Sequence, residues 1–378
     1  MKMIPITEFC SLNMGQSPDS KTYNENGNGL PFYQGNADFG EIHPETRVWC
    51  SDPVKIANAG DILISVRAPI GAMNIATECC CIGRGLAALT PLSDKCKLKY
   101  LFYAIQSRVD DLIAQGTGST FKAISKKVLE STSIPAYSLD EQTQIIDKIA
   151  IVDDAITKRK QQLALIDQLV KSRFIELFGD PVLNPFGWTT TPLLEMGYCK
   201  NGMNFHTGDS GIEMHCLGVG DFKDFSVIDG TDHLPLISLN EAPPEESMLQ
   251  DGDIVFVRSN GNKALVGRCL VVYPRGTPTT YSGFCIRYRL TSNKVDISYL
   301  LRVLKTDSMR KRMAGRGANI QNLNQQILSA LDIPIPPMEL QKQFATFVEQ
   351  TDKSKYCSSL SYNYCQLTAN YFRQEWTT

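Results

Sequence analysis

The feature that most restricts the possible folds is an internal repeat. Four short blocks of sequence recur with a constant offset of 199 positions, although the segments between them differ strongly. One such match would be chance, whereas four matches in register indicate duplication of one unit. The chain is therefore expected to fold as two similar halves. The matching blocks are Tyr100-Leu101 with Tyr299-Leu300, Gly116-x-Gly118 with Gly315-x-Gly317, Ile134-Pro135 with Ile333-Pro334, and Gln142-x-Gln144 with Gln341-x-Gln343.

Each copy follows the same order of expected elements. Alternating apolar runs rich in β-branched residues, such as 62–66 and 254–257, are broken by Gly, Pro and Asn and indicate short strands. One short helix is expected next, over 100–114 in the first copy and over 297–313 in the second. An Ile-Pro pair then ends a strand, because proline lacks the amide donor and disfavours helix in the residue before it. A long helix follows in each copy.

Clear signals bound the first long helix. Ser138 and Glu141 form a Ser-x-x-Glu capping box, and Gly179 followed by Pro181 supplies the stop. Apolar residues between them recur at spacings of three and four, which predicts a coiled-coil seam about 60 Å long. The second long helix, from Met338 onward, has a less regular stripe. The residues expected to pack helix against helix are Ile149, Val152, Ile156, Leu163, Ile166, Val170, Phe344, Phe347, Leu360, Tyr364, Leu367 and Tyr371.

Together these elements predict an α+β fold with a pseudo-two-fold internal repeat. Two similar strand-rich domains are joined by two long antiparallel coiled-coil helices, because the first helix carries the chain to the second domain and the second helix returns. The expected segments are 1–137 and 180–337 for the two domains, 138–179 for the central helix and 338–378 for the C-terminal helix.

Composition places the chain among soluble globular proteins. It is 43% hydrophobic and 21% charged, and it has no apolar run near the ~20 residues that a membrane span needs and no recognisable signal peptide. We therefore expect a cytoplasmic protein. Its twelve cysteines include no Cys-x-x-Cys pair and its four histidines are scattered, so no metal site is expected and buried reduced thiols are the simpler interpretation.

Familiar enzyme signatures are missing. The sequence has no P-loop and no Glu-x-Lys of a metal-dependent nuclease core, and Asn184-Pro185-Phe186 lacks the second proline of an adenine methyltransferase motif. "GVGDF" from Gly218 lacks the strand and helix context of a dinucleotide site. The chain is therefore expected to be non-catalytic. The alternative, a stand-alone nuclease or methyltransferase with an unrecognised site, stays open because catalytic residues can be far apart in sequence.

The net charge of −2 hides a segregation of charge. Residues 195–253 contain twelve acidic and two basic residues, whereas 254–316 contain thirteen basic and two acidic ones. A domain built from these stretches could carry a positive face, such as phosphate binding requires. Alternatively, the two stretches interleave and neutralise each other.

Polar residues suited to DNA occur in equivalent loops of the two copies. Glycine pairs beside a cation, from Gly116 and from Gly315, let the backbone approach phosphates, although a tight turn explains them equally well. Arg and Lys can read guanine, and Asn and Gln can read adenine, but each such residue can also be solvated surface. The candidate DNA-binding residues are Gln34, Asn36, Arg67, Arg84, Thr117, Ser119, Lys122, Arg258, Asn260, Asn262, Lys263, Arg316, Asn319 and Gln321.

Several longer stretches carry a family resemblance over essentially the whole chain. They are "GQSPDSKTYN" from Gly15, "GDILISVRAPIG" from Gly60, "IPAYSLDEQTQI" from Ile134 and "KSRFIELFGDP" from Lys171, with weaker echoes from Asp251, Gly315 and Ile333. With them the chain resembles the DNA specificity subunit of type I restriction-modification systems.

This resemblance implies more than the spacing shows. Two target-recognition domains would each read one half of a bipartite, asymmetric site on double-stranded DNA. The helix pair would act as a spacer that docks two adenine-N6 methyltransferase subunits, with restriction subunits that translocate DNA joining the complex. S-adenosylmethionine, ATP and Mg would belong to those partners, and this chain would bind no cofactor. The second helix departs from the family's Leu-x-Glu-Gln start, because it reads Met338-Glu339-Leu340-Gln341.

Overall fold

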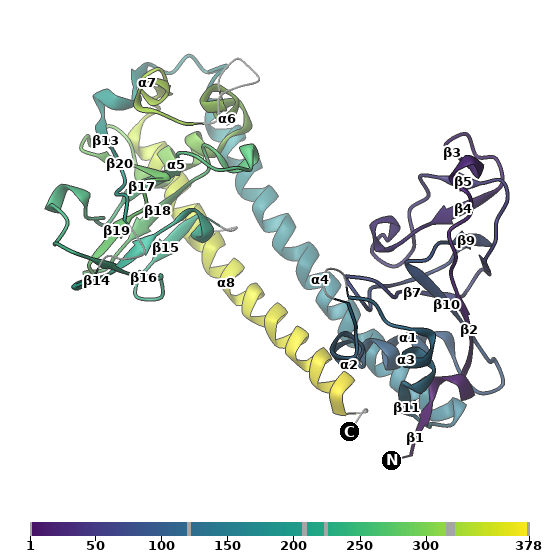
Figure 1. Cartoon of the computed structure of the whole chain (residues 1–378). Coiled ribbons are helices and arrows are strands. Elements are labelled where there is room, and N and C mark those ends of the chain that lie inside the picture. The colour runs from purple at the N-terminus through teal and green to yellow at the C-terminus, as the bar shows by residue number, and fades with distance from the viewer. Residues whose placement is uncertain (1, 119–121, 206–209, 223–225, 315–321, 376–378) are drawn as a thin grey trace. The chain divides into compact units, whose positions relative to one another are not determined.

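The computed structural model describes residues 2–118, 122–205, 210–222, 226–314 and 322–375, the side chains of 314, 356 and 369–375 excepted. The chain forms two compact units (Figure 1). Unit 1 comprises Met1–Gln161 and Ser358–Thr378, and unit 2 comprises Gln162–Cys357. Both units mix helices with strands, as predicted. Among the described residues, no helix is both long and apolar enough to cross a membrane.

Unit 1 contains a four-stranded sheet of order β2-β10-β7-β8, a five-stranded sheet of order β3-β5-β4-β9-β6, and an antiparallel ribbon of β1 with β11. Its short helices are α1 (Leu98–Gln106), α2 (Val109–Ala114) and α3 (Lys126–Ser131). The strands are β1 (Met3–Pro5), β2 (Cys10–Met14), β3 (Tyr23–Asn24), β4 (Leu30–Tyr33), β5 (Trp49–Cys50), β6 (Ile56–Ala57), β7 (Ile62–Ser65), β8 (Met73–Ile75), β9 (Cys80–Ile82), β10 (Leu86–Pro91) and β11 (Ser133–Pro135).

Unit 2 repeats this plan. It contains a five-stranded sheet of order β13-β20-β17-β18-β15, a three-stranded sheet of order β16-β14-β19, and a ribbon of β12 with β21. Its short helices are α5 (Ile297–Lys305), α6 (Asp307–Ala314) and α7 (Gln325–Ser329). The strands are β12 (Thr190–Pro192), β13 (Gly197–Asn201), β14 (Ile212–Leu217), β15 (Val227–Asp229), β16 (Leu236–Leu239), β17 (Asp253–Val257), β18 (Cys269–Tyr273), β19 (Thr279–Tyr281), β20 (Cys285–Leu290) and β21 (Asp332–Pro334).

The central strand of each unit is buried on both faces. On β7, Ile62 and Ile64 pack into the core beneath the short helices, whereas Leu63 points into a second core. On β17, Ile254 and Phe256 do the same on one face, with Val255 and Val257 on the other. Successive side chains of a strand point to opposite faces, so a continuous apolar run is what a doubly covered strand requires. The predicted strands over 62–66 and 254–257 are thus confirmed.

The single short helix predicted in each copy is wrong in detail, because each is broken into two. The first copy has α1 and α2, and the second has α5 and α6. In the second copy, Thr306 adopts an extended conformation between the helices. Its hydroxyl accepts a hydrogen bond from the amide of Met309 at 3.4 Å, so it ends one helix and caps the next.

The repeated tyrosine fixes the Ile-Pro ribbon in both units. The hydroxyl of Tyr100 donates to the carbonyl oxygen of Pro135 at 2.6 Å, and the hydroxyl of Tyr299 donates to that of Pro334 at 2.9 Å. All four groups are in buried surroundings. The same hydrogen bond therefore holds the Ile-Pro ribbon against α1 in unit 1 and against α5 in unit 2. This explains why the Tyr-Leu and Ile-Pro blocks recur with one offset.

The first glutamine of each repeated Gln-x-Gln ties the long helix to the same region. In unit 1 the Gln142 side chain is fully buried. Its oxygen accepts from the Lys97 amide at 2.8 Å, and its nitrogen donates to the carbonyls of Lys95 and Tyr137, both at 2.9 Å. All three partners are backbone groups, so the amide joins the start of the long helix to the segment that leads into α1.

Unit 2 repeats this arrangement with Gln341. Its oxygen accepts from the Asp296 amide at 2.7 Å, and its nitrogen donates to the carbonyls of Lys294 at 3.2 Å and Pro336 at 2.8 Å. Because buried backbone groups are costly to leave unpaired, a glutamine is required at this position in each copy.

We predict that Gln142→Leu lowers the stability of unit 1, and Gln341→Leu that of unit 2, by about 2–4 kcal/mol, because each leaves three backbone groups unpaired. The chain offers matched controls, since the second glutamine of each pair, Gln144 and Gln343, is exposed. Gln144→Leu and Gln343→Leu are expected to change stability by less than about 0.5 kcal/mol. Urea denaturation of the four variants measures this, and equal losses within a pair would contradict the prediction.

The long helices are α4 (Leu139–Phe178) and α8 (Met338–Glu375), of 40 and 38 residues. The capping box at the start of α4 is confirmed: the Ser138 amide donates to the Glu141 carboxylate at 2.8 Å, and the Glu141 amide donates to the Ser138 hydroxyl at 3.4 Å. Gly179 ends the helix with φ of 73°, a conformation that glycine adopts without strain.

Within unit 2, the end of α4 lies against the beginning of α8. The rings of Phe174 and Phe178 contact the ring of Phe344, with centroids 5.5 and 5.6 Å apart. Two to three turns earlier on α4, Asp167 pairs with Lys355, which lies farther along α8, at 2.7 Å. Contacts that advance along one helix while they recede along the other show that these two segments run antiparallel.

The residues predicted to pack helix against helix differ in burial. Ile149 packs into the core of unit 1, and Val170, Phe344 and Phe347 pack into or against that of unit 2. Val152, Ile156, Leu163 and Ile166 are half-buried. The side chain of Tyr371 lies outside the described residues.

The prediction is wrong for Leu360, Tyr364 and Leu367, whose side chains are exposed. In this stretch of α8 the buried residues are Thr351 and Ser358, which follow Phe344 at steps of seven. At about 100° per residue, Leu360 and Leu367 project from roughly the opposite side to Ser358. Small polar residues therefore form the inward face, and the larger apolar ones face outward.

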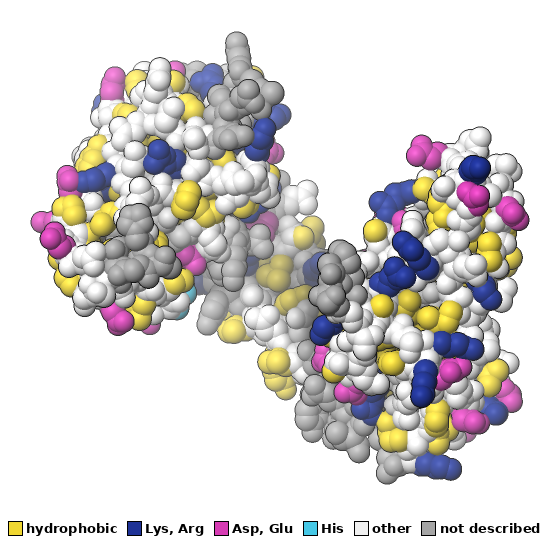
Figure 2. All heavy atoms as spheres, viewed as in Figure 1, with side chains coloured by type: hydrophobic (Ala, Val, Ile, Leu, Met, Phe, Trp, Pro, Cys, Tyr) yellow, Lys and Arg dark blue, Asp and Glu magenta, His cyan; other side chains and the backbone are white. Residues whose placement is uncertain are grey.

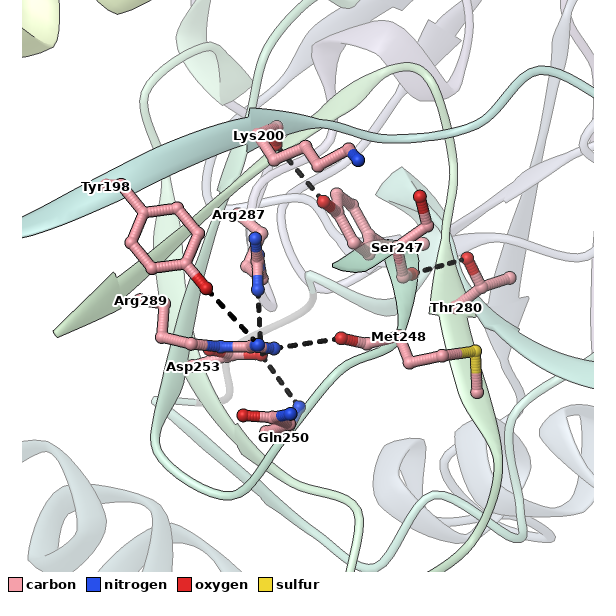
Figure 3. A network of polar contacts seen from close by, with 10 residues as sticks. Tyr198, Lys200, Ser247, Met248, Gln250, Asp253, Thr280, Arg287 and Arg289 are labelled. Carbon is pink, nitrogen blue, oxygen red and sulfur yellow. Dashed lines mark hydrogen bonds and ion pairs between the residues drawn. The ribbon is translucent and has the colours of Figure 1, made fainter. Parts of the chain in front are cut away.

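Unit 2 contains a buried network of charges around Asp253 (Figure 3). The Asp253 carboxylate accepts from Nε and Nη2 of Arg289 at 2.8 and 2.7 Å, and these hydrogen bonds raise the pKa of the Arg289 guanidinium. Arg287 is 0% exposed, lies 4.0 Å from the same carboxylate and stacks over the Tyr198 ring at 5.1 Å. None of the three guanidinium nitrogens of Arg287 has a hydrogen-bond partner among the described residues.

The corresponding aspartate of unit 1, Asp61, has no arginine or lysine partner among the residues that the structure describes. Asp61 is also buried, and its carboxylate accepts from the Asn58 amide at 2.8 Å. The strand register pairs Arg287 with Val255 in unit 2 and Ala88 with Leu63 in unit 1. Alanine thus occupies the place of the buried arginine. The network is a property of the second copy.

Candidate nucleic-acid interface

Candidate residues of the first copy come together along one edge of unit 1. This unit 1 edge is made of the loops after β4, β7 and β9 and the segment after α2. All five of its candidate side chains are exposed. Figure 2 shows Lys and Arg side chains spread over the visible face of unit 1, among apolar ones. The residues of the unit 1 edge are Gln34, Arg67, Arg84, Thr117 and Lys122.

Backbone hydrogen bonds join these loops. The Gly85 amide donates to the carbonyl of Gln34 at 3.2 Å, and the Val66 amide donates to that of Gly85 at 2.9 Å. The Ala68 amide donates to the carbonyl of Lys122 at 3.0 Å. Segments far apart in sequence are thereby held as one surface, and their side chains can act on one ligand.

Glycines on both sides of Arg84 allow the loops to approach. A Cβ placed on Gly85 would lie 2.4 Å from the carbonyl oxygen of Gln34, and one on Gly83 would lie 2.9 Å from its Cα. Any other residue at these positions would force the loops apart. Arg84 is therefore presented on a tight turn directly beside Gln34. An exposed guanidinium beside a carboxamide can contact phosphates or base edges.

Asn36 lies next to this edge, at the start of the short helix η3 (Asn36–Asp38), and is half-buried. The Asp38 carboxylate accepts from the Gln34 amide at 2.8 Å and pairs with Arg47 at 2.9 Å. This aspartate holds the loop that presents Gln34. Sequence reasoning did not identify Arg47, which is exposed and follows a loop without a strong pattern.

The second copy has an equivalent edge, here called the unit 2 edge. The Arg258 amide donates to the carbonyl of Phe284 at 2.8 Å, as that of Val66 does to Gly85 in unit 1. The Arg258 guanidinium donates to the carbonyl of Gly283 at 3.3 Å. The unit 2 edge consists of Arg258, Asn260, Asn262, Lys263 and Phe284.

Two of its asparagines are engaged locally. The Asn260 oxygen accepts from the Asn262 amide at 2.8 Å, and the Asn262 oxygen accepts from the Ala264 amide at 3.0 Å, capping η7 (Lys263–Leu265). A bidentate contact with adenine uses both the oxygen and the nitrogen of a carboxamide. In this conformation both asparagines shape the turn with one of the two atoms they would need for such a contact.

Phe284 was missed by sequence reasoning, which searched for polar groups. It is 61% exposed and follows Gly283 in the turn between β19 and β20. An exposed aromatic ring beside an arginine can stack on a base or enter between base steps. Ser119, Arg316, Asn319 and Gln321, also predicted from the sequence, lie outside the described residues.

The charged stretches of the second copy interleave only in part. Arg275 pairs with Asp229 at 2.6 Å and with Asp251 at 3.2 Å, and Arg289 pairs with Asp253. These contacts join the basic stretch to the acidic one, as the alternative interpretation proposed. Arg268, Arg302, Lys305 and Arg310 instead surround one cavity of unit 2.

The fold has counterparts among known proteins. The crystal structure of a type I restriction-modification S subunit from M. genitalium matches 100% of this chain and 96% of that chain, with a TM-score of 0.55. At 14% identity, this likeness concerns the fold. The two chains share a fold over nearly their whole lengths.

Sequence comparison gives specific relatives. MjaX, a type I restriction enzyme specificity subunit of Methanocaldococcus jannaschii, is 40% identical over 164 residues, which are 43% of this chain and 39% of that protein. The StySPI specificity subunit of Salmonella potsdam is 27% identical over 252 residues, which are 62% of this chain and 53% of that protein. The chain spans about half the length of these relatives or less. The "type I restriction modification DNA specificity domain" family matches residues 1–166 and 243–356, most of the chain. The chain therefore belongs to the family of type I restriction-modification DNA specificity subunits.

Proposed function

We propose that this chain is a sequence-specific, non-catalytic DNA-binding subunit of a cytoplasmic type I restriction-modification complex. Each unit reads one half of a bipartite target, and α4 and α8 hold the two units apart. The observation that carries the proposal is the repeated framework of this family's fold, in which equivalent loops form an exposed edge in each unit. Membership of a specificity-subunit family disfavours the alternative of a stand-alone nuclease or methyltransferase.

Differences between the two edges support an asymmetric target. The unit 1 edge has three exposed cations, Arg67, Arg84 and Lys122. The unit 2 edge has one exposed cation, Lys263, and an arginine whose guanidinium is partly engaged, Arg258, together with the exposed aromatic ring of Phe284. Because specificity comes from the groups that reach base edges, two edges of different chemistry select different half-sites.

The long helices support the role of a spacer. At 1.5 Å per residue, the 40 residues of α4 extend about 60 Å, enough to separate two readers by one or more turns of DNA at ~34 Å each. The antiparallel contacts of α4 with α8 in unit 2 agree with a coiled-coil pair. Two readers on one stiff spacer bind more tightly than either alone, because the second contact becomes intramolecular.

Exposed apolar residues on the long helices support docking of two methyltransferase subunits. Leu165 is 63% exposed, and Tyr364, at the equivalent position of the second repeat, is 72% exposed. Leu169 on α4 and Leu360 and Leu367 on α8 are exposed as well. Apolar stripes of this kind mark protein contacts. One equivalent position, Leu165 and Tyr364, is exposed in both copies, which agrees with two similar docking sites. S-adenosylmethionine, ATP and Mg are assigned to the partner subunits.

The proposal is tested by reconstitution. The pure chain, incubated with DNA, Mg and S-adenosylmethionine, is expected to neither cleave nor methylate. With an adenine methyltransferase subunit encoded by the same host, methylation should appear at a split, asymmetric sequence, located by mapping methylated adenines. Methylation or cleavage by the chain alone would refute a purely recognising role.

We predict that neutralising the unit 1 edge reduces the salt dependence of DNA binding. Each of Arg67→Gln, Arg84→Gln and Lys122→Gln that removes a phosphate contact should lower the slope of log affinity against log salt by about 0.9. Lys95→Gln is the control, because Lys95 is an exposed cation in the segment that precedes α1. Fluorescence anisotropy over a range of salt concentrations gives the slope. A slope near zero in the unmodified protein would favour a scaffold without a nucleic-acid role.

A further inference from the structure

Unit 2 contains a cavity of about 330 Å³ whose lining is dominated by cations. They come from segments far apart in sequence: Lys171 from α4, Arg268 from the turn before β18, Arg302 and Lys305 from α5, and Arg310 from α6. Asp307 is the acidic residue of this lining. Figure 1 shows α5, α6 and β18 in the same part of unit 2. We call these residues the cationic cavity.

Helix electrostatics explains part of this arrangement. Arg302 and Lys305 lie in the last turn of α5, where cations interact favourably with the negative end of the helix. The same argument does not account for Arg268, which lies in a loop, or for Lys171, which projects from another helix. Convergence of these two on the end of α5 requires a further reason.

The cations are held in place by neutral groups. The Lys305 ammonium donates to the Ser226 hydroxyl at 2.7 Å, and the Arg310 guanidinium donates to the carbonyl of Ala264 at 2.9 Å. Arg268 follows Gly267, whose φ of 78° sets the turn. These contacts orient the cations without neutralising them, so their charge remains available to a ligand.

The carboxylates do not balance this charge, because one carboxylate, that of Asp307, lines the cavity together with five cations. Burial lowers the pKa of both Arg302 and Lys305, and the Arg302 charge acts on Lys305 in the same direction. Asp167 and Asp352 oppose the effect on Arg302, but Asp167 is already paired with Lys355 at 2.7 Å. Burial raises the pKa of the Asp352 carboxyl, which weakens its contribution as an anion. Cations that lose hydration without gaining an anion that compensates their charge favour binding of an anionic ligand.

We propose that the cationic cavity is a binding site for a phosphate group. Guanidinium groups match the geometry of phosphate oxygens with paired hydrogen bonds, and lysines add point charges. A volume of about 330 Å³ lies at the small end of the usual range for small-molecule sites, which suits a phosphate or pyrophosphate with a few waters. Two sources supply such a group: a free phosphate or polyphosphate, and the DNA backbone, of which the second depends on the function proposed above.

The test uses the full chain with inorganic phosphate and pyrophosphate at constant ionic strength. Calorimetric titration and thermal unfolding should show binding and a rise in Tm. Arg302→Gln should weaken binding about ten-fold or more, because a charge-assisted hydrogen bond is lost, while leaving the Tm without anion unchanged or higher. Arg268→Gln should weaken binding similarly. Lys294→Gln is the control, since Lys294 is an exposed cation of unit 2 outside the cavity and its loss should change affinity less than two-fold.

Absence of any anion-dependent rise in Tm, or equal binding by the Arg302→Gln and Lys294→Gln variants, would overturn the proposal. A purely structural role for Arg302 predicts instead that Arg302→Gln lowers the Tm with and without anion alike. The two sources separate in a competition experiment with duplex DNA. Pyrophosphate displaces DNA if the cavity holds a backbone phosphate, and both bind together if the ligand is a free anion.

Discussion

Asp253→Asn is expected to destabilise unit 2 by about 3–5 kcal/mol while leaving unit 1 folded, because removal of one partner from a buried ion pair leaves an uncompensated charge. Here a single carboxylate serves two guanidinium groups, Arg289 through two short hydrogen bonds and Arg287 at 4.0 Å. Asparagine keeps an acceptor for the turn that Asp253 forms with the Gln250 amide at 2.7 Å. The loss is therefore mainly electrostatic.

The repeat supplies a matched control. Asp61→Asn makes the same change in unit 1, where the carboxylate accepts from a backbone amide at 2.8 Å and alanine replaces the buried arginine. Its expected cost is about 1 kcal/mol. Hydrogen–deuterium exchange with peptide resolution separates the two units, with β7 and β10 reporting on unit 1 and β17 and β20 on unit 2.

A second substitution distinguishes charge from shape. In the Asp253→Asn background, Arg287→Met should recover much of the lost stability, because it removes a buried cation with no hydrogen-bond partner among the described residues. If Asp253 acted only as the cap of its turn, Arg287→Met would add its own cost to that of Asp253→Asn. Equal losses of protection for Asp61→Asn and Asp253→Asn would also count against the electrostatic argument.

The buried arginine shows what sequence patterns leave out. In β20, Cys285, Arg287 and Arg289 alternate with Ile286, Tyr288 and Leu290, which is the pattern of a strand with one solvent face. In the structure, the segment around η6 (Glu245–Ser247) covers that face. The carbonyl oxygen of Met248, directly after η6, accepts a hydrogen bond from the Arg289 guanidinium at 2.9 Å. Burial by a loop depends on tertiary packing, and local periodicity carries no information about it.

The internal repeat predicted the fold better than local hydrophobic periodicity did. The offset of 199 positions predicted two similar units, although it did not explain why tyrosine and glutamine recur. Their buried hydrogen bonds to backbone groups supply the reason. The helix seam was predicted less well, because apolar spacing in α8 does not reveal that Thr351 and Ser358 form the inward face. For the unit 1 edge, the position of arginines directly after predicted strands was enough to identify Arg67 and Arg84. Which loops lie side by side depends on hydrogen bonds between distant backbone segments, and these could not be predicted from the sequence.

The second prediction with a large effect concerns specificity. Replacing residues 180–337 with the corresponding segment of a relative that reads another target should change one half of the methylated sequence and leave the other half intact. In the proposed function, each wrong base pair costs about 1–3 kcal/mol, so a half-site of several base pairs changes affinity by orders of magnitude. Mapping methylated adenines in cells that carry the hybrid measures both halves at once.

The exchanged segment must keep its contacts with the long helices α4 and α8. The Tyr299 ring stacks on the Phe174 ring of α4, with centroids 5.9 Å apart, and meets the Phe178 ring edge-on at 4.7 Å. The Tyr299 hydroxyl donates to the carbonyl oxygen of Pro334. The Asp296 amide must also reach Gln341 of α8. These groups join the recognition domain to helices that the exchange leaves in place, so a donor that keeps the tyrosine and the Ile-Pro ribbon should fold onto them.

The reciprocal exchange of residues 1–137 should alter the other half-site alone. Tyr100 and the segment that pairs with Gln142 then play the same part for unit 1. Unchanged spacing between the half-sites is expected in both hybrids, because both retain α4 and α8, which are the spacer in the proposed function. A hybrid that changes both halves would mean that the two units read DNA jointly. A hybrid with altered spacing would mean that the strand-rich domains, and not the long helices, determine the separation of the half-sites.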